Sequence, residues 1–235
     1  MSDLIVLITG ANRGIGFELT KQYLINGWTV IATCRNEKAS ADLITLKDKF
    51  SEKLLIELMD ITCPENIEKL ANKLSEESIK IDLIINNAGY LDQENKSIHD
   101  INYANAEMSF KVNSLGPLFL THCLLSLLKK NRLCKIAIIS SVMGSLTRKR
   151  SVDWYGYRMS KAAANMLAVN LSNELVNDNV AVVAVHPGWV QTDMGGSSAR
   201  ENVKDSALGI MKVILHLSID TTGKFYDFKG EELPF

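Results

Sequence analysis

The chain has 235 residues, of which 46% are hydrophobic and 23% are charged, and its formal net charge at pH 7 is −1. This composition is typical of one soluble globular domain with a sizeable core. No long basic or acidic block occurs, which argues against binding to nucleic acid or to an anionic membrane.

The cysteines and the N-terminus favour a cytoplasmic protein. The four cysteines form no CxxC pair, and no nearby histidine pair would complete a metal site. We therefore expect free, reduced thiols and no bound metal. The first residues lack the basic leader and cleavage site of a signal peptide. No apolar run reaches the ~18 residues that a membrane-spanning helix needs.

Six short apolar runs, rich in β-branched residues, predict buried strands. The runs are nearly continuous rather than alternating, which is typical of parallel strands covered by helices on both faces. We expect strands at residues 4–9, 29–34, 54–59, 81–86, 135–140 and 180–185, and a weaker seventh strand at 224–228.

Helical patterns separate these strands, at about residues 14–26, 39–50, 64–78, 101–130, 155–177 and 201–217. The alternation of strand and helix predicts a single Rossmann-type, doubly wound α/β domain over residues 1–235. Its parallel sheet would have about seven strands, with helices on both faces. Residues 187–205 form the longest stretch without clear periodicity, and such long loops are usually functional or disordered.

Three glycines follow the first predicted strand, in the segment TGANRGIG at residues 9–16. Glycines allow a sharp turn and a close approach of the backbone to a pyrophosphate, and the next helix supplies N–H groups. The spacing of Gly10, Gly14 and Gly16 differs from G-x-G-x-x-G. The order of strand, turn and helix is nevertheless that of a dinucleotide site. The alternative is a tight turn without a ligand.

The end of the second predicted strand indicates which dinucleotide binds. An NAD site usually has an acidic residue there for the ribose 2′-hydroxyl, whereas this chain has Cys34 followed by Arg35. Arg13 lies inside the glycine turn, and two guanidinium groups suit a 2′-phosphate. We therefore predict NADP(H) rather than NAD(H), the alternative being that Arg35 merely faces solvent.

Tyr157 and Lys161 lie four residues apart in the segment YGYRMSK and share one face of a predicted helix. Such a pair is a weak signal alone. Polar segments also follow three of the predicted strands: NNAG at 86–89, IISS at 138–141 and HPGWVQT at 186–192. Ligands of open parallel sheets bind at the carboxyl ends of the strands, so we expect these groups to meet there.

In order and spacing, TGANRGIG, NNAG, a serine ahead of YRMSK, and PGWVQT resemble the short-chain dehydrogenase/reductase family over essentially the whole chain. Within it, HPGWVQTDMGG and the ending GKFYDFKGEELPF resemble the sniffer and C-factor-like carbonyl reductases. The resemblance implies an NADPH-dependent enzyme that reduces the C=O group of aldehydes, ketones or quinones by hydride transfer.

The resemblance also implies roles for four catalytic residues. Tyr157 matches the acid/base that gives its proton to the substrate oxygen. Lys161 matches the lysine that holds the nicotinamide ribose and lowers the tyrosine pKa, because a nearby cation favours the phenolate. Ser141 matches the serine that hydrogen-bonds the carbonyl, with Ser140 as the alternative. Asn113 matches the asparagine that supports a water relay to the lysine.

The same comparison implies a set of cofactor contacts. The glycine turn would hold the pyrophosphate, Asp60 and Ile61 the adenine, and the segment after the sixth strand the nicotinamide amide. The full expected set is Gly10, Asn12, Arg13, Gly14, Ile15, Gly16, Arg35, Asp60, Ile61, Asn87, Ala88, Gly89, Tyr157, Lys161, Pro187, Gly188, Val190 and Thr192.

Fifteen residues separate Ser141 from Tyr157, more than is common in the family, and the additional residues lie beside the expected substrate cleft. Met143, Trp154 and Trp189 are candidates for lining that cleft, and ordinary loop packing is their alternative role.

Two further readings stay open. The chain could be an NADP(H)-binding signalling or redox-sensor protein with little turnover, or an NAD-dependent alcohol dehydrogenase. We also expect a homodimer or homotetramer formed by the helices at 101–130 and 155–177, whose alternative role is internal packing.

Overall fold

The computed structural model describes residues 4–36, 41–94, 97–129, 131–148 and 153–235. Its centre is a seven-stranded sheet with the order β3-β2-β1-β4-β5-β6-β7. Every neighbouring pair of strands is parallel. This confirms the predicted doubly wound α/β fold, in which the order of strands reverses between β1 and β4.

The strands lie where the apolar runs predicted them. Their bounds are β1 Ile5–Ile8, β2 Thr29–Cys34, β3 Leu54–Leu58, β4 Leu83–Asn86, β5 Cys134–Ile139, β6 Val180–His186 and β7 Lys224–Asp227. The strands β1, β4, β5 and β6 are almost fully buried, as expected for strands covered on both faces.

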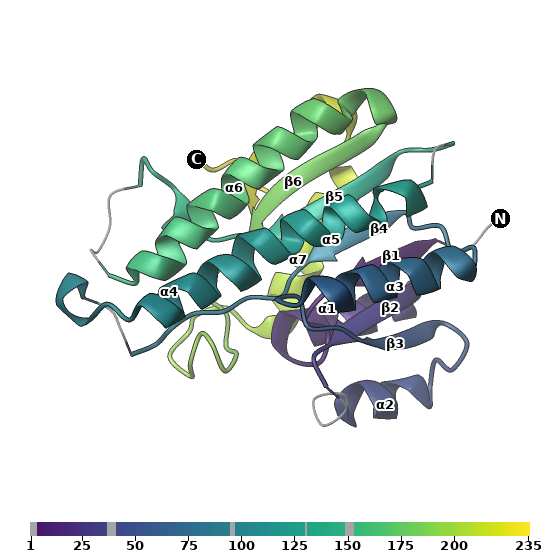
Figure 1. Cartoon of the computed structure of the whole chain (residues 1–235), viewed down its shortest axis with the longest axis horizontal. Helices are drawn as coiled ribbons and strands as arrows, with labels where there is room; N and C mark the ends of the chain where they lie inside the picture. The colour runs from purple at the N-terminus through teal and green to yellow at the C-terminus, as the bar shows by residue number, and fades with distance from the viewer. Residues whose placement is uncertain (1–3, 37–40, 95–96, 130, 149–152) are drawn as a thin grey trace.

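The helices agree with the sequence pattern except in one place. Their bounds are α1 Gly14–Ile25, α2 Ala41–Lys47, α3 Pro64–Glu76, α4 Tyr103–Phe110, α5 Gly116–Leu124, α6 Tyr155–Leu175 and α7 Val203–His216. The single helix predicted over 101–130 is wrong. It is divided into α4 and α5 by a π-helical segment, Lys111–Leu115, and ends in a 3-10 turn, Leu125–Leu127. Figure 1 shows α4, α5 and α6 crossing in front of the strands.

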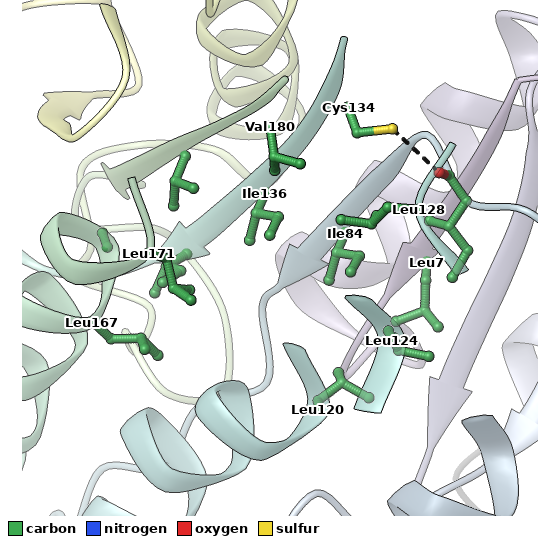
Figure 2. Close-up of a cluster of buried hydrophobic side chains, with 14 of the residues drawn as sticks. Leu7, Ile84, Leu120, Leu124, Leu128, Cys134, Ile136, Leu167, Leu171 and Val180 are labelled. Atoms are coloured by element: carbon green, nitrogen blue, oxygen red, sulfur yellow. Dashed lines mark hydrogen bonds between the residues drawn. The ribbon is translucent and has the colours of Figure 1, made fainter. Parts of the chain in front are cut away.

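Two apolar layers hold the helices to the sheet. One lies between the sheet and α3, α5 and α6, where Leu7, Leu124 and Leu171 are buried together (Figure 2). The other lies under α1, α2 and α7 and contains Leu19 and Ile210. Burying both faces fixes the sheet, so the loops at its carboxyl edge project from a rigid support.

None of the helices in the described part of the chain is both long and apolar enough to cross a lipid bilayer. All four cysteines are free thiols, as expected.

Candidate active site

The ends of β1 and β4 are joined by hydrogen bonds at the carboxyl edge of the sheet. The Thr9 hydroxyl accepts from the amides of Asn87 and Ala88, at 2.9 and 3.0 Å. The Asn87 side chain donates back to the carbonyls of Thr9 and Gly10, at 2.9 and 3.2 Å. The glycine turn and the NNAG segment therefore form one rigid floor at the point where the strand order reverses.

The glycines of the turn are required by space and by backbone conformation. Gly10 and Gly14 have positive φ values of 61° and 53°, which side chains rarely adopt. A Cβ atom at Gly16 would lie 2.2 Å from the Gly10 carbonyl oxygen. The turn thus leaves an open cradle of backbone N–H groups at the start of α1, of the kind that holds a diphosphate.

A cavity of about 780 Å³ runs over this floor. Most of the predicted cofactor-binding residues line it, from the glycine turn at one end to Tyr157 and Lys161 at the other. Arg35, Asp60 and Ile61 lie on its wall beyond the ends of β2 and β3. The size and the glycine cradle fit an extended dinucleotide.

Gly188 and Val190 are not among the described residues that line this cavity. A Cβ at Gly188 would meet the Phe228 ring at 2.9 Å, and Val190 is buried and bridges to Glu201. Both serve the packing of the 187–205 loop, while Pro187 and Thr192 of the same loop do face the cavity.

Tyr157 and Ser141 are joined by a hydrogen bond. Burial raises the pKa of Tyr157 from 10.0 to about 12, and the Ser141 hydrogen bond acts against this increase. The phenol is therefore less acidic than a free tyrosine, contrary to the expectation that Lys161 lowers its pKa. Desolvation penalises the phenolate more than its neighbours stabilise it.

Lys161 is buried beside Tyr157, with its Nζ atom 5.7 Å from the centre of the tyrosine ring. Its ammonium donates to the Ile139 carbonyl at 2.8 Å. Burial lowers the pKa of Lys161 from 10.5 to about 8, so the side chain is still mainly charged at pH 7. A buried cation that faces the cavity is costly, which is typical of a functional site.

The geometry distinguishes the two candidate serines. The Ser140 hydroxyl is buried and donates to Asn165 at 2.5 Å, so it connects β5 to α6. The Ser141 hydroxyl accepts from the Met143 amide at 3.1 Å and also contacts Tyr157. Ser140 is nevertheless one of the residues that line the cavity, and Ser141 is not among those described there.

Asn113 lies in the π-helical segment, and its amide is fully engaged. Its Oδ1 atom accepts from the Tyr90 amide at 2.8 Å, and its Nδ2 atom donates to the Tyr90 carbonyl and to the Ser160 hydroxyl, both at 2.9 Å. Ser160 in turn donates to the Tyr157 carbonyl at 2.8 Å. The Asn113 side chain therefore positions the backbone around the site, and the water relay stays a prediction.

The three candidate substrate residues do not line the large cavity. Trp154 lies at the start of α6 with a φ of 48° and borders a small adjoining cavity that Tyr157 also lines. The Trp189 side chain is exposed and donates to the Gly195 carbonyl at 2.8 Å. Met143 accepts from Arg158 at 3.4 Å through its carbonyl. Part of the 142–156 loop lies outside the described residues.

Sequence reasoning missed several residues that line the large cavity. They are Tyr90, Asn105, Met108, Gln191 and Met194. Tyr90 directly follows NNAG and could have been found from that position. Asn105 and Met108 lie on α4, and the sequence pattern did not show which side of this helix faces the cavity.

The comparisons with known proteins agree with this geometry. The short chain dehydrogenase family model matches residues 4–203. The C-signal protein of Myxococcus xanthus is 40% identical over 155 residues, which cover 66% of this chain and 93% of that protein.

Two of the similar solved structures match this chain over the full length of both proteins. An NADPH-bound carbonyl reductase from chicken fatty liver superposes with a TM-score of 0.92 at 31% identity. The carbonyl reductase Sniffer of D. melanogaster gives a TM-score of 0.92 at 28% identity. These matches confirm the resemblance that the sequence motifs indicated, and the chain belongs to the short chain dehydrogenase family of oxidoreductases.

Proposed function

We propose that the protein is an NADPH-dependent carbonyl reductase that acts on aldehydes, ketones or quinones. The observation that carries this proposal is the single cavity that joins the glycine turn to the paired Tyr157 and Lys161. The NADPH-bound carbonyl reductase of the same fold supports it.

NADPH, when bound, supplies the hydride that reaches the carbonyl carbon. The raised pKa of Tyr157 keeps its phenol protonated at neutral pH, so the chain holds a proton donor rather than a base. Tyr157 gives this proton to the carbonyl oxygen as negative charge develops there. The hydrogen bond from Ser141 holds the phenol in place, and Lys161 contributes a positive charge beside it.

We propose NADP(H) rather than NAD(H) as the cofactor. Cys34 ends β2 in place of an acidic residue, and Arg35 and Arg13 both line the cavity near this end. A 2′-phosphate there would meet guanidinium groups and no carboxylate on β2. Comparing the dissociation constants of NADPH and NADH tests this step and also the NAD-dependent alternative.

The decisive experiment is a screen of aldehydes, ketones and quinones with NADPH, followed by loss of the NADPH absorbance. We expect turnover with at least one reactive carbonyl and its loss in Tyr157→Phe. Tight NADPH binding without turnover over the whole panel would contradict the proposal.

That outcome would favour the second candidate, an NADP(H)-binding signalling or sensor protein. The observation in its favour is the similarity to a protein named C-signal. Against it, a pure sensor would not need the Tyr157, Lys161 and Ser141 arrangement, which is intact here.

We further propose a cytoplasmic homodimer or homotetramer assembled through the outer faces of α4, α5 and α6. Large apolar side chains that do not line the cavity are exposed on these three helices: Tyr103, Leu118, Met159 and Met166. Sedimentation velocity tests the assembly, and a monomer at micromolar concentration would contradict it.

A further inference from the structure

The guanidinium of Arg13 is already bound to a carboxylate in this structure. Its Nη1 atom lies 2.6 Å from Oδ2 of Asp193, a residue 180 positions later in the chain. Both residues line the large cavity. Arg13 belongs to the glycine turn and Asp193 to the loop after β6, so the pair spans from one side of the cavity to the other.

The structure holds Asp193 in a folded turn rather than in a loose loop. The Gly196 amide donates to the Thr192 carbonyl at 2.8 Å, and the Gly195 amide donates to the Thr192 hydroxyl at 3.1 Å. From the other side, Gln93 donates to the carbonyls of Asp193 and Met194, at 3.3 and 3.2 Å. These bonds place the carboxylate in front of Arg13.

We propose that Asp193 is a specificity-determining residue that competes with the 2′-phosphate of NADP(H) for Arg13. This inference rests on the proposed function, because it requires NADP(H) to be the cofactor. A phosphate group carries more negative charge than a carboxylate and binds a guanidinium through two oxygens. A 2′-phosphate on Arg13 therefore displaces the Asp193 carboxylate, since two anions this close repel each other.

The competition has a consequence for the rest of the site. The turn that carries Asp193 also carries Thr192 and Met194, which line the cavity. The methyl group of Met194 would lie 3.5 Å from a Cβ atom at Gly89, in the NNAG segment. The same turn packs against the glycine turn, since the Thr192 methyl group would lie 3.1 Å from a Cβ atom at Gly14. Release of Asp193 by the 2′-phosphate therefore removes one contact between the two turns, and NADH, which lacks this phosphate, leaves the ion pair in place.

The test is the affinity of Asp193→Asn for four probes, measured by calorimetry. The probes are NADPH, NADH, 2′-AMP and 5′-AMP. An exposed ion pair contributes about 0.2–1 kcal/mol, so its removal should tighten NADPH and 2′-AMP binding by roughly 1.5- to 5-fold at low salt. Binding of NADH and 5′-AMP should change by less. The gain should shrink as salt is added.

Two further variants make the test specific. Asp178→Asn removes the same charge from an exposed turn just before β6, at the opposite edge of the sheet, and should leave all four affinities unchanged. In the background of Arg13→Gln, the Asp193→Asn change should no longer tighten NADPH binding, because the shared partner is gone.

Equal tightening of NADPH and NADH would overturn the proposal, because it would indicate a general effect on the loop. A gain that persists without Arg13 would overturn it as well. If the wild-type chain binds neither NADPH nor 2′-AMP, the proposed cofactor fails first, and this result is separate from any effect of Asp193.

Discussion

Replacing Lys161 with methionine should stabilise the cofactor-free protein while it abolishes catalysis. Lys161 is buried, and burial lowers its pKa from 10.5 to about 8. Below pH 8 the side chain is charged in both the folded and the unfolded chain, so the full cost of burying the charge is present. The lowering of the Lys161 pKa from 10.5 to about 8 corresponds to about 3 kcal/mol.

Methionine is unbranched like lysine but one atom shorter, and it loses the hydrogen bond to the Ile139 carbonyl. That loss costs about 1 kcal/mol. The net gain in the free energy of unfolding at pH 7 is therefore about 1–2 kcal/mol. In a chain of this size this corresponds to a rise in Tm of roughly 2–8 °C.

The stability difference between the wild type and Lys161→Met should depend on pH in a defined direction. Between pH 8 and pH 10.5 the folded chain releases the Lys161 proton before the unfolded chain does, so the stability of the wild type rises with pH. The advantage of Lys161→Met should therefore shrink over this range. The raised pKa of Tyr157 changes stability only above about pH 10 and affects both proteins alike.

Thermal unfolding followed by circular dichroism at pH 7 and pH 9.5 measures both effects. Lys204→Met, on the exposed surface of α7, is the control for the loss of a lysine and should change Tm little at either pH. A Lys161→Met protein that is less stable than the wild type at pH 7, or a difference that does not change with pH, would refute the reasoning.

Four other substitutions test the site. Tyr157→Phe should lower the single-turnover rate of carbonyl reduction about 10²–10⁴-fold, and an undiminished rate would disprove its role as proton donor. Gly16→Ala places a Cβ 2.2 Å from the Gly10 carbonyl oxygen; it should cost about 1–3 kcal/mol of stability and weaken NADPH binding measured by calorimetry. Ser141→Ala should lower kcat/KM more than Ser140→Ala does, whereas Ser140→Ala should lower Tm more, because its hydroxyl connects β5 to Asn165. The opposite ranking would indicate that Ser140, and not Ser141, hydrogen-bonds the substrate carbonyl.

The fold could be predicted closely because its strands are buried on both faces. In runs such as VAVVAV at 180–185, apolar and polar residues do not alternate, so neither face of the strand is predicted to meet solvent. Each run is also followed by a segment with helical periodicity. A strand of this kind fits only inside a parallel sheet. The predicted strand ends are therefore correct to within two residues.

The site was predictable in its backbone and less so in its side chains. The glycine turn and the NNAG segment depend on local backbone geometry, and the spacing of their glycines in the sequence indicates that geometry. Met143, Trp154 and Trp189 are candidates only because they are large and close to the site in sequence. In the structure Met143 and Trp189 contact other parts of the chain, and Trp154 borders the small cavity that Tyr157 also lines. The Arg13–Asp193 pair could not be predicted, because it joins two loops 180 residues apart.

The division of the long helix at Asn113 did have a signal in the sequence. Pro117 lies four residues after Asn113 and has no amide hydrogen, so the regular α-helical bond to the Asn113 carbonyl cannot form. The chain widens instead, and the Gly116 amide donates to the Lys111 carbonyl, five residues earlier. Gly116 also fits closely, since a Cβ there would lie 2.5 Å from Ile61. Such π-helical turns are frequent at functional sites, and here the turn carries the residue whose amide holds Tyr90 and Ser160. In this chain the glycine–proline pair inside an otherwise regular helix pattern therefore indicates where the helix is interrupted, and the interrupted segment contains the residue that positions Tyr90 and Ser160.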